Sequence, residues 1–122
     1  MKPGRLKLDA GTRATGDREV AYLAVAGEVD LSNAEELREA VDDTGGNGAG
    51  VVIDLTDVGF MDSSGLAVIL QAARDRESRL VIVAAPGSAV ERLLEMTEAA
   101  GRVRLMGSEQ QALEALADPD AG

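Results

Sequence analysis

The sequence predicts an α/β domain with a five-stranded mixed sheet, an N-terminal hairpin and about four helices. Short runs of Val, Leu, Ile and Ala, typical of buried strands, alternate with segments whose apolar residues recur at helical spacing. The first two runs follow each other without a helix, which favours an antiparallel pair, whereas the later strand-helix-strand repeats favour parallel pairing. At 122 residues we expect a single domain with a core at about residues 5–117 and a frayed tail at 118–122.

The first third of the chain predicts the hairpin and one helix. The expected elements are strands at Arg5–Ala10 and Val20–Ala26, joined by a polar connection over Gly11–Glu19. Ser32 and Glu35 have the spacing of a capping box, which predicts a helix that starts at Ser32 and ends near Asp43. The glycine-rich stretch 44–50 predicts a plain connecting loop, because it precedes a strand and lacks the spacing of phosphate-binding loops.

The rest of the chain predicts three more strand-helix units. The expected strands are Val51–Leu55, Leu80–Ala84 and Val103–Met106, and the expected helices run from about Ser64 to Arg76, from Ser88 and from Ser108. Ser88 with Glu91 and Ser108 with Gln111 repeat the capping-box spacing.

Composition excludes several classes of function. The chain has no cysteine and no histidine, which removes thiolate nucleophiles, the commonest general base and the commonest metal ligands. No segment has the length and hydropathy of a signal peptide or a membrane span, so the cytoplasm is the expected location. We expect no cofactor and no metal.

The acidic residues are concentrated in one part of the chain. Between Glu28 and Asp62 there are ten acids and one base, a net charge of −9 out of the total of −10. Nucleic acid is an improbable partner, because its phosphates need a basic surface and the chain has only two aromatic residues, Tyr22 and Phe60. A basic protein partner fits the charge better.

The tetrapeptide Asp62-Ser63-Ser64-Gly65 lies between a predicted buried strand and a helix, at the strand end where sites collect in α/β sheets. Helix capping by Asp or Ser alone explains such a sequence in most chains. The two hydroxyls also lie where the helix N-terminus would accept a phosphate, and a phosphoserine beside Asp62 would change the surface charge strongly.

The segment FMDSSGLAVIL, preceded by GEVDLSNAEELREAV from Gly27 to Val41, resembles the STAS-domain family and, within it, the bacterial anti-sigma factor antagonists. The resemblance extends from about Leu6 to Leu116. It implies that Ser63 is phosphorylated by a partner that is both a serine kinase and an anti-sigma factor, that Asp30 and Asp62 flank this serine, and that Ser64 and Gly65 complete the motif. It further implies a binding switch without enzymatic activity, which frees a sigma factor when unphosphorylated and is reset by a serine phosphatase.

Two other functions remain open from the sequence. STAS domains also serve in sensory scaffolds and as small subunits of membrane transport systems, which use the same fold with another partner. An enzyme would need Asp54, Asp57 and Asp62 as a carboxylate cluster for metal-assisted phosphoryl transfer, but they lack the usual tight spacing and no lysine follows Lys7. The oligomeric state does not follow from these patterns.

Overall fold

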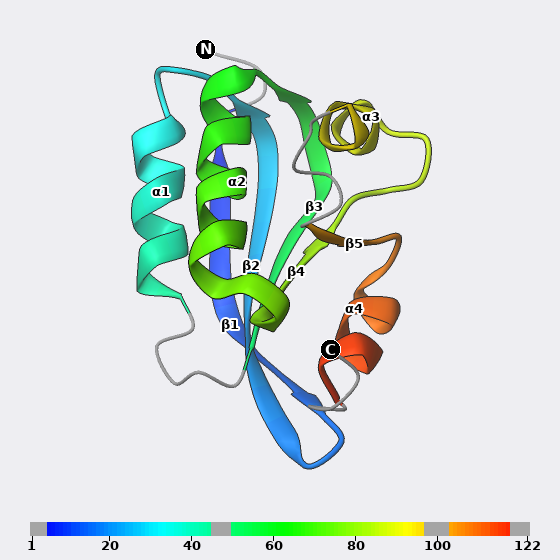
Figure 1. Cartoon of the computed structure of the whole chain (residues 1–122). Helices are drawn as coiled ribbons and strands as arrows, with labels where there is room; N and C mark the ends of the chain where they lie inside the picture. The colour runs from blue at the N-terminus through cyan, green and yellow to red at the C-terminus, as the bar shows by residue number, and fades with distance from the viewer. Residues whose placement is uncertain (1–4, 45–49, 97–102, 118–122) are drawn as a thin grey trace.

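All five strands belong to one sheet in the order β1-β2-β3-β4-β5 (Figure 1). The computed structural model describes residues 5–44, 50–96 and 103–117. Within these residues the strands are β1 (Lys7–Thr15), β2 (Arg18–Val29), β3 (Val51–Met61), β4 (Leu80–Val83) and β5 (Arg104–Met106). β1 is antiparallel to β2 and the other neighbours are parallel, so the predicted mixed sheet with an N-terminal hairpin is confirmed.

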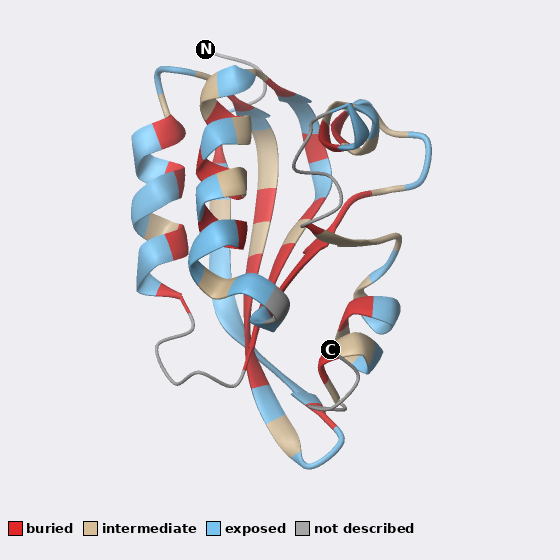
Figure 2. Ribbon diagram, viewed as in Figure 1, coloured by how far each residue is buried: buried red, intermediate tan, exposed pale blue. Residues whose placement is uncertain are grey.

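Helices cover both faces of this sheet. In the described part of the chain these are α1 (Ala34–Asp43), α2 (Ser63–Arg76), α3 (Ala89–Glu95), α4 (Glu109–Ala117) and a short 3-10 turn, η1 (Glu77–Arg79). The side chains of β2 alternate between two cores: Leu23 and Val25 pack in the core shared with α1, α2 and α3, whereas Val20 and Tyr22 pack against α4. Figure 2 shows the buried residues concentrated on the central strands and on the inner sides of the helices.

The hairpin is longer than the sequence predicts. Only Gly16 and Asp17 separate the strands, and the residues assigned to a polar connection pair with β2 as far as Thr15 and Arg18. The prediction was wrong because β1 is an edge strand whose residues are mostly exposed, so it lacks the apolar alternation of a half-buried strand. Gly16 has φ of +60°, the conformation that a tight two-residue hairpin turn requires at its first central residue.

Strand β3 is also longer than predicted, continuing past Leu55 to Met61. Its pairing with β2 shifts twice, because β3 has two more residues than β2 between the Ala24–Asp54 pair and the Glu28–Phe60 pair. Such bulges let a strand continue where its alternation breaks, and they realign its end with its neighbour. The structure brings Met61 beside Val29 in this way.

The predicted capping box at Ser32 does not form. α1 begins at Ala34 with Asn33 at the N-cap position, and the Ser32 hydroxyl instead donates to Asp30 at 2.5 Å. Ser88 and Ser108 do cap their helices, each accepting from the backbone N–H three residues later, at 3.1 Å and 3.2 Å. Two of the three expected serine caps are therefore confirmed.

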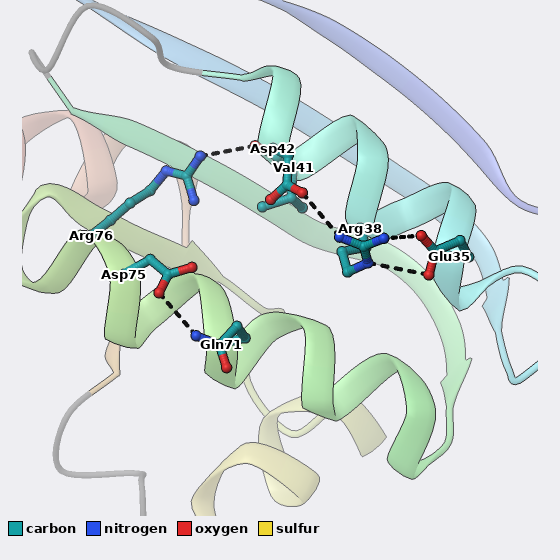
Figure 3. Close-up of polar contacts among 7 residues, drawn as sticks. All are labelled: Glu35, Arg38, Val41, Asp42, Gln71, Asp75 and Arg76. Atoms are coloured by element: carbon teal, nitrogen blue, oxygen red, sulfur yellow. Dashed lines mark hydrogen bonds and ion pairs between the residues drawn. The ribbon is translucent and has the colours of Figure 1, made fainter.

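Arg76 connects the C-terminal ends of α1 and α2 (Figure 3). Its guanidinium donates to the carbonyl oxygens of Val41 at 3.0 Å and Thr44 at 3.2 Å. α1 has no basic residue in its own last turn, so Arg76 supplies the positive charge that the free carbonyls at a helix C-terminus favour. The loop expected over 44–50 lies mostly outside the described residues, as does the tail expected at 118–122.

Candidate functional site

The ends of β2 and β3 lie side by side and bring two separated segments together. Val29 pairs with Met61, and the N–H of Asp62 donates to the carbonyl of Val29 at 3.1 Å. Asp30 and Asp62 therefore follow directly from neighbouring paired residues, although they are far apart in the sequence. Both side chains are half-buried.

Asp62 is the N-cap of α2. Its Oδ1 accepts hydrogen bonds from the backbone N–H groups of Ser64 at 2.8 Å and Gly65 at 3.3 Å. These bonds satisfy two of the donors that a helix N-terminus leaves free. The capping explanation of this aspartate thus agrees with the structure.

Ser63 is the first residue of α2 and is exposed, whereas Ser64 is half-buried. Among the described residues, the Ser63 hydroxyl has no hydrogen-bond partner. It lies at the positive end of a helix of 14 residues, where a negative group is stabilised. Of the two hydroxyls, that of Ser63 is therefore the more accessible to a partner.

Gly65 is buried against the end of β2. A Cβ atom at this position would lie 2.6 Å from Cγ1 of Val29 and 2.9 Å from Cγ of Met61. The absence of a side chain lets the first turn of α2 pack directly on the paired ends of the two strands.

Asp30 organises the turn between β2 and α1. Its Oδ1 accepts from the backbone N–H of Ser32 at 2.9 Å as well as from the Ser32 hydroxyl, and its own N–H donates to the side chain of Asn33 at 2.9 Å. Asn33 in turn donates to the carbonyl of Glu28 at 2.9 Å. This network holds the turn beside the start of α2.

A protein-family model described as "Mlab, STAS domain" matches residues 12–107, most of the chain. The chain belongs to the STAS-domain family. Its fold is similar to that of an anti-sigma factor antagonist from Mycobacterium paratuberculosis, with a TM-score of 0.80 and 23% identity over 96% of this chain and 98% of that one.

Two further solved structures share this fold. The phosphorylated form of the Bacillus cell fate determinant SpoIIAA has a TM-score of 0.61 and 16% identity, over 88% of this chain and 97% of that one. The murine anion transporter Slc26a9 has a TM-score of 0.67 and 18% identity over 86% of this chain, which corresponds to 18% of the transporter. At these identities the likeness establishes the fold. Over the described residues of this STAS domain, no helix is long and apolar enough to cross a membrane.

Two exposed apolar residues of this STAS domain lie within two positions of Asp30 or Asp62 in the sequence, and the sequence interpretation did not identify them. Leu31, directly after Asp30, is 79% exposed, and Phe60, two residues before Asp62, is 49% exposed. Among large apolar side chains of the described residues, Met96 is the other exposed one. Their places in the sequence could have indicated this exposure. Leu31 lies in a polar segment before a helix, and Phe60 lies where β3 departs from regular alternation of buried and exposed residues. We call Leu31, Phe60, Asp62 and Ser63 the Ser63 face.

The acidic segment is divided between the two faces of the sheet. Asp54 lies on the α4 side, where its carboxylate accepts from the Tyr22 hydroxyl and from both the N–H (2.9 Å) and the hydroxyl (2.5 Å) of Thr56. On α1, Arg38 pairs with Glu35 and with Asp42 at 3.3 Å (Figure 3). The concentration of charge in the sequence is thus not one surface patch.

The three aspartates considered for an enzyme do not form a metal site. Asp54 is bound by Tyr22 and Thr56, whereas Asp62 caps α2. Within residues 5–44, 50–96 and 103–117, no three acidic side chains gather closely enough to hold a metal ion.

Among the described residues, three titrating groups have shifted pKa values, Tyr22, Glu35 and Arg38, and all three lie outside the Ser63 face. Burial, with hydrogen bonds to Asp54 and Glu109, raises the pKa of the Tyr22 phenol. The hydrogen bond from Arg38 lowers the pKa of Glu35.

Proposed function

We propose that this STAS domain is an anti-sigma factor antagonist controlled by phosphorylation of Ser63. In its unphosphorylated form it binds an anti-sigma factor that is also a serine kinase and thereby releases a sigma factor. Phosphorylation of Ser63 switches this binding off, and a serine phosphatase resets it. The domain acts as a binding switch and not as an enzyme.

The observation that carries this proposal is the exposed Ser63 hydroxyl at the start of α2, next to the capping carboxylate of Asp62. A phosphate there would add about −1.5 to −2 charges at neutral pH. The helix end attracts such a group by roughly 0.3–1 kcal/mol, similar in size to the repulsion from nearby exposed carboxylates. We therefore expect the fold to persist while the surface changes.

The effect on a partner would be much larger than the effect on the fold. A partner surface that covers Ser63 would have to remove water from a dianion, which is costly unless a cation pairs with it. Leu31 and Phe60 are exposed apolar residues at the paired ends of β2 and β3, and they would supply the apolar contact that such a surface buries.

The test begins with the partner. Ser63→Ala bound to a resin and incubated with cell extract should retain an ATPase-type kinase, and that kinase with ATP should add one phosphate to the wild-type domain. Mass spectrometry should place the phosphate on Ser63, with Ser64→Ala as a matched control that is still phosphorylated. A phosphate on Ser64, or none, would exclude the assignment of Ser63.

Calorimetry tests the charge mechanism. Ser63→Ala should bind the kinase as tightly as the wild type, and Ser63→Asp should bind more weakly; equal affinities would contradict the mechanism. Asp30→Asn keeps an oxygen that can accept from Ser32 and removes the charge, so unchanged phosphorylation and binding would separate Asp30 from the site.

A second candidate function is a STAS subunit of a membrane transport system, favoured by the shared fold with the Slc26a9 anion transporter. Recovery of a transporter subunit and no kinase in the same capture experiment would support this candidate over the antagonist.

A further inference from the structure

Strand β1 is a long edge strand that the domain leaves exposed. It occupies one end of the sheet order, and seven of its nine residues are exposed (Figure 2). Its register with β2 runs without a bulge from Lys7 to Thr15. A regular edge of this length presents unpaired backbone groups that another strand can join.

The hairpin turn determines which backbone groups point outward. Thr15 and Arg18 flank a two-residue turn, and in such a turn the flanking residues exchange hydrogen bonds. Because these pairs alternate along an antiparallel ladder, the odd-numbered residues of β1 bond to β2. The N–H and C=O groups of the even-numbered residues from Leu8 to Ala14 therefore point to the outer edge.

The sequence of this edge is complementary to itself. When two copies of β1 are aligned antiparallel about Gly11, Asp9 of one copy lies opposite Arg13 of the other, twice per pair. In the same alignment Leu8 faces Ala14 and Ala10 faces Thr12, so the outward backbone groups face each other as an antiparallel ladder requires. Asp9 and Arg13 then occupy non-hydrogen-bonded positions, where opposing side chains approach most closely.

We propose that the domain forms a symmetric homodimer through β1, with the two sheets joined into one about Gly11. The occupant of the edge is a second copy, because the register that satisfies the backbone also places opposite charges across the interface. Arg13, whose Nε already pairs with Glu109 at 3.4 Å, would exchange the bond of its Nη1 group to the Thr12 carbonyl, now 3.0 Å, for contact with Asp9 of the second copy, and can keep its position 4.2 Å from the Tyr22 ring centroid.

Charge opposes this association and predicts its salt dependence. Each copy carries a net charge of −10, and α1, which contacts β1, exposes several carboxylates. Salt screens this long-range repulsion and also the two Asp9–Arg13 attractions, but with −10 on each copy the repulsion is the larger effect, and the backbone ladder is insensitive to salt. The dimer should therefore strengthen as salt is added.

The dimer would place its two Ser63 faces far from each other. The strands β2 of the two copies run antiparallel across the joined sheet, so the carboxyl ends that carry Ser63 point in opposite directions. Both sites stay open to a partner, and the inference does not depend on what that partner is.

Sedimentation equilibrium of the wild-type domain tests the proposal and should show a monomer-dimer equilibrium. Thr12→Pro removes an outward N–H and leaves the bonds to β2 in place, so it should yield a folded monomer, whereas Thr12→Ala should still dimerise. Circular dichroism verifies the fold of each variant. A wild type that stays monomeric at high protein and salt concentration, or a Thr12→Pro variant that dimerises normally, would overturn the proposal.

Charge reversal tests the register. Asp9→Arg alone places like charges opposite each other twice and should weaken the dimer by at least about tenfold, as should Arg13→Asp. A mixture of the two variants restores both opposite-charge pairs and should form heterodimers. Asp9→Arg homodimers as stable as the wild type would exclude the alignment about Gly11, and if Arg13→Asp fails to fold, Asp9→Arg and Thr12→Pro still decide the question.

Discussion

Gly65 of α2 packs on Val29 at the end of β2 so closely that a Cβ atom at position 65 would lie 2.6 Å from Cγ1 of Val29. This contact determines how closely the N-terminus of α2, where Ser63 lies, packs on the ends of β2 and β3. The atoms that a larger residue would meet belong to buried side chains, so there is no open space into which they can move.

Gly65→Ala should therefore destabilise the domain by about 1–3 kcal/mol, the usual cost of forcing a methyl group into a packed core. Urea unfolding measures this loss. Gly59→Ala is the matched control, because a Cβ at Gly59 meets nothing within 4 Å, and it should be neutral. Equal stability of the two variants would show that the contact relaxes easily.

Asp62→Ala should lower the free energy of unfolding by about 1 kcal/mol, because it leaves two helix N–H groups without their acceptor. Asp62→Asn can still cap and should retain most of the stability while it removes the charge beside Ser63. Thermal unfolding compares them. A stable alanine variant would mean that water replaces the cap at no cost.

If the proposed function is right, Phe60→Ala and Leu31→Ala should each weaken partner binding by about tenfold, because exposed apolar residues near the proposed phosphorylation site are the natural anchors of an interface. Neither change should alter stability by more than about 0.5 kcal/mol. Met96→Ala, which truncates a residue at the end of α3 that is about as exposed as Leu31, serves as the control in the same calorimetric titration. Unchanged affinity in both variants would remove these residues from the interface.

Arg76→Met should destabilise the domain by about 1–2 kcal/mol through loss of the two bonds to the end of α1. Arg74→Met is matched in chemistry and lies in the same last turn of α2, but Arg74 bonds the exposed Gln71 and should contribute little. Guanidinium unfolding of both variants isolates the contribution of the link between the helices. Equal losses would mean that only the charge at the end of α2 matters.

Tyr22 should make the domain sensitive to alkali. The pKa of its phenol is raised in the folded state, so the phenol ionises first in the unfolded chain, and stability present below a pH of about 10 is lost above it. Because Tyr22 is the only tyrosine, phenolate absorbance follows this group alone. The Tyr22→Phe variant should not show the loss of folding stability that phenol ionisation causes at alkaline pH. A Tyr22 phenol that titrates at its ordinary pKa in the folded protein would contradict the expectation.

The order of strands and helices could be predicted because it follows from local apolar periodicity. The strand lengths could not. The residues of β1 are exposed at an edge and those of β3 beyond Leu55 follow two bulges, so neither shows the alternation by which a strand is recognised. The cap at Ser32 failed because α1 begins at Ala34 with Asn33 at the N-cap position, so Ser32 lies in the preceding turn, where it donates to Asp30.

For the candidate site, local sequence was enough to predict that Asp62, Ser63, Ser64 and Gly65 start a helix after a buried strand, since capping and helix initiation depend on neighbouring residues. What surrounds these residues follows from the folded sheet. The pairing of Val29 with Met61 brings Asp30 close to the start of α2, and chain packing leaves Leu31 and Phe60 exposed while it turns Asp54 to the opposite face. These features depend on sheet register and on contacts between residues far apart in the sequence. Composition and local spacing do not predict such contacts.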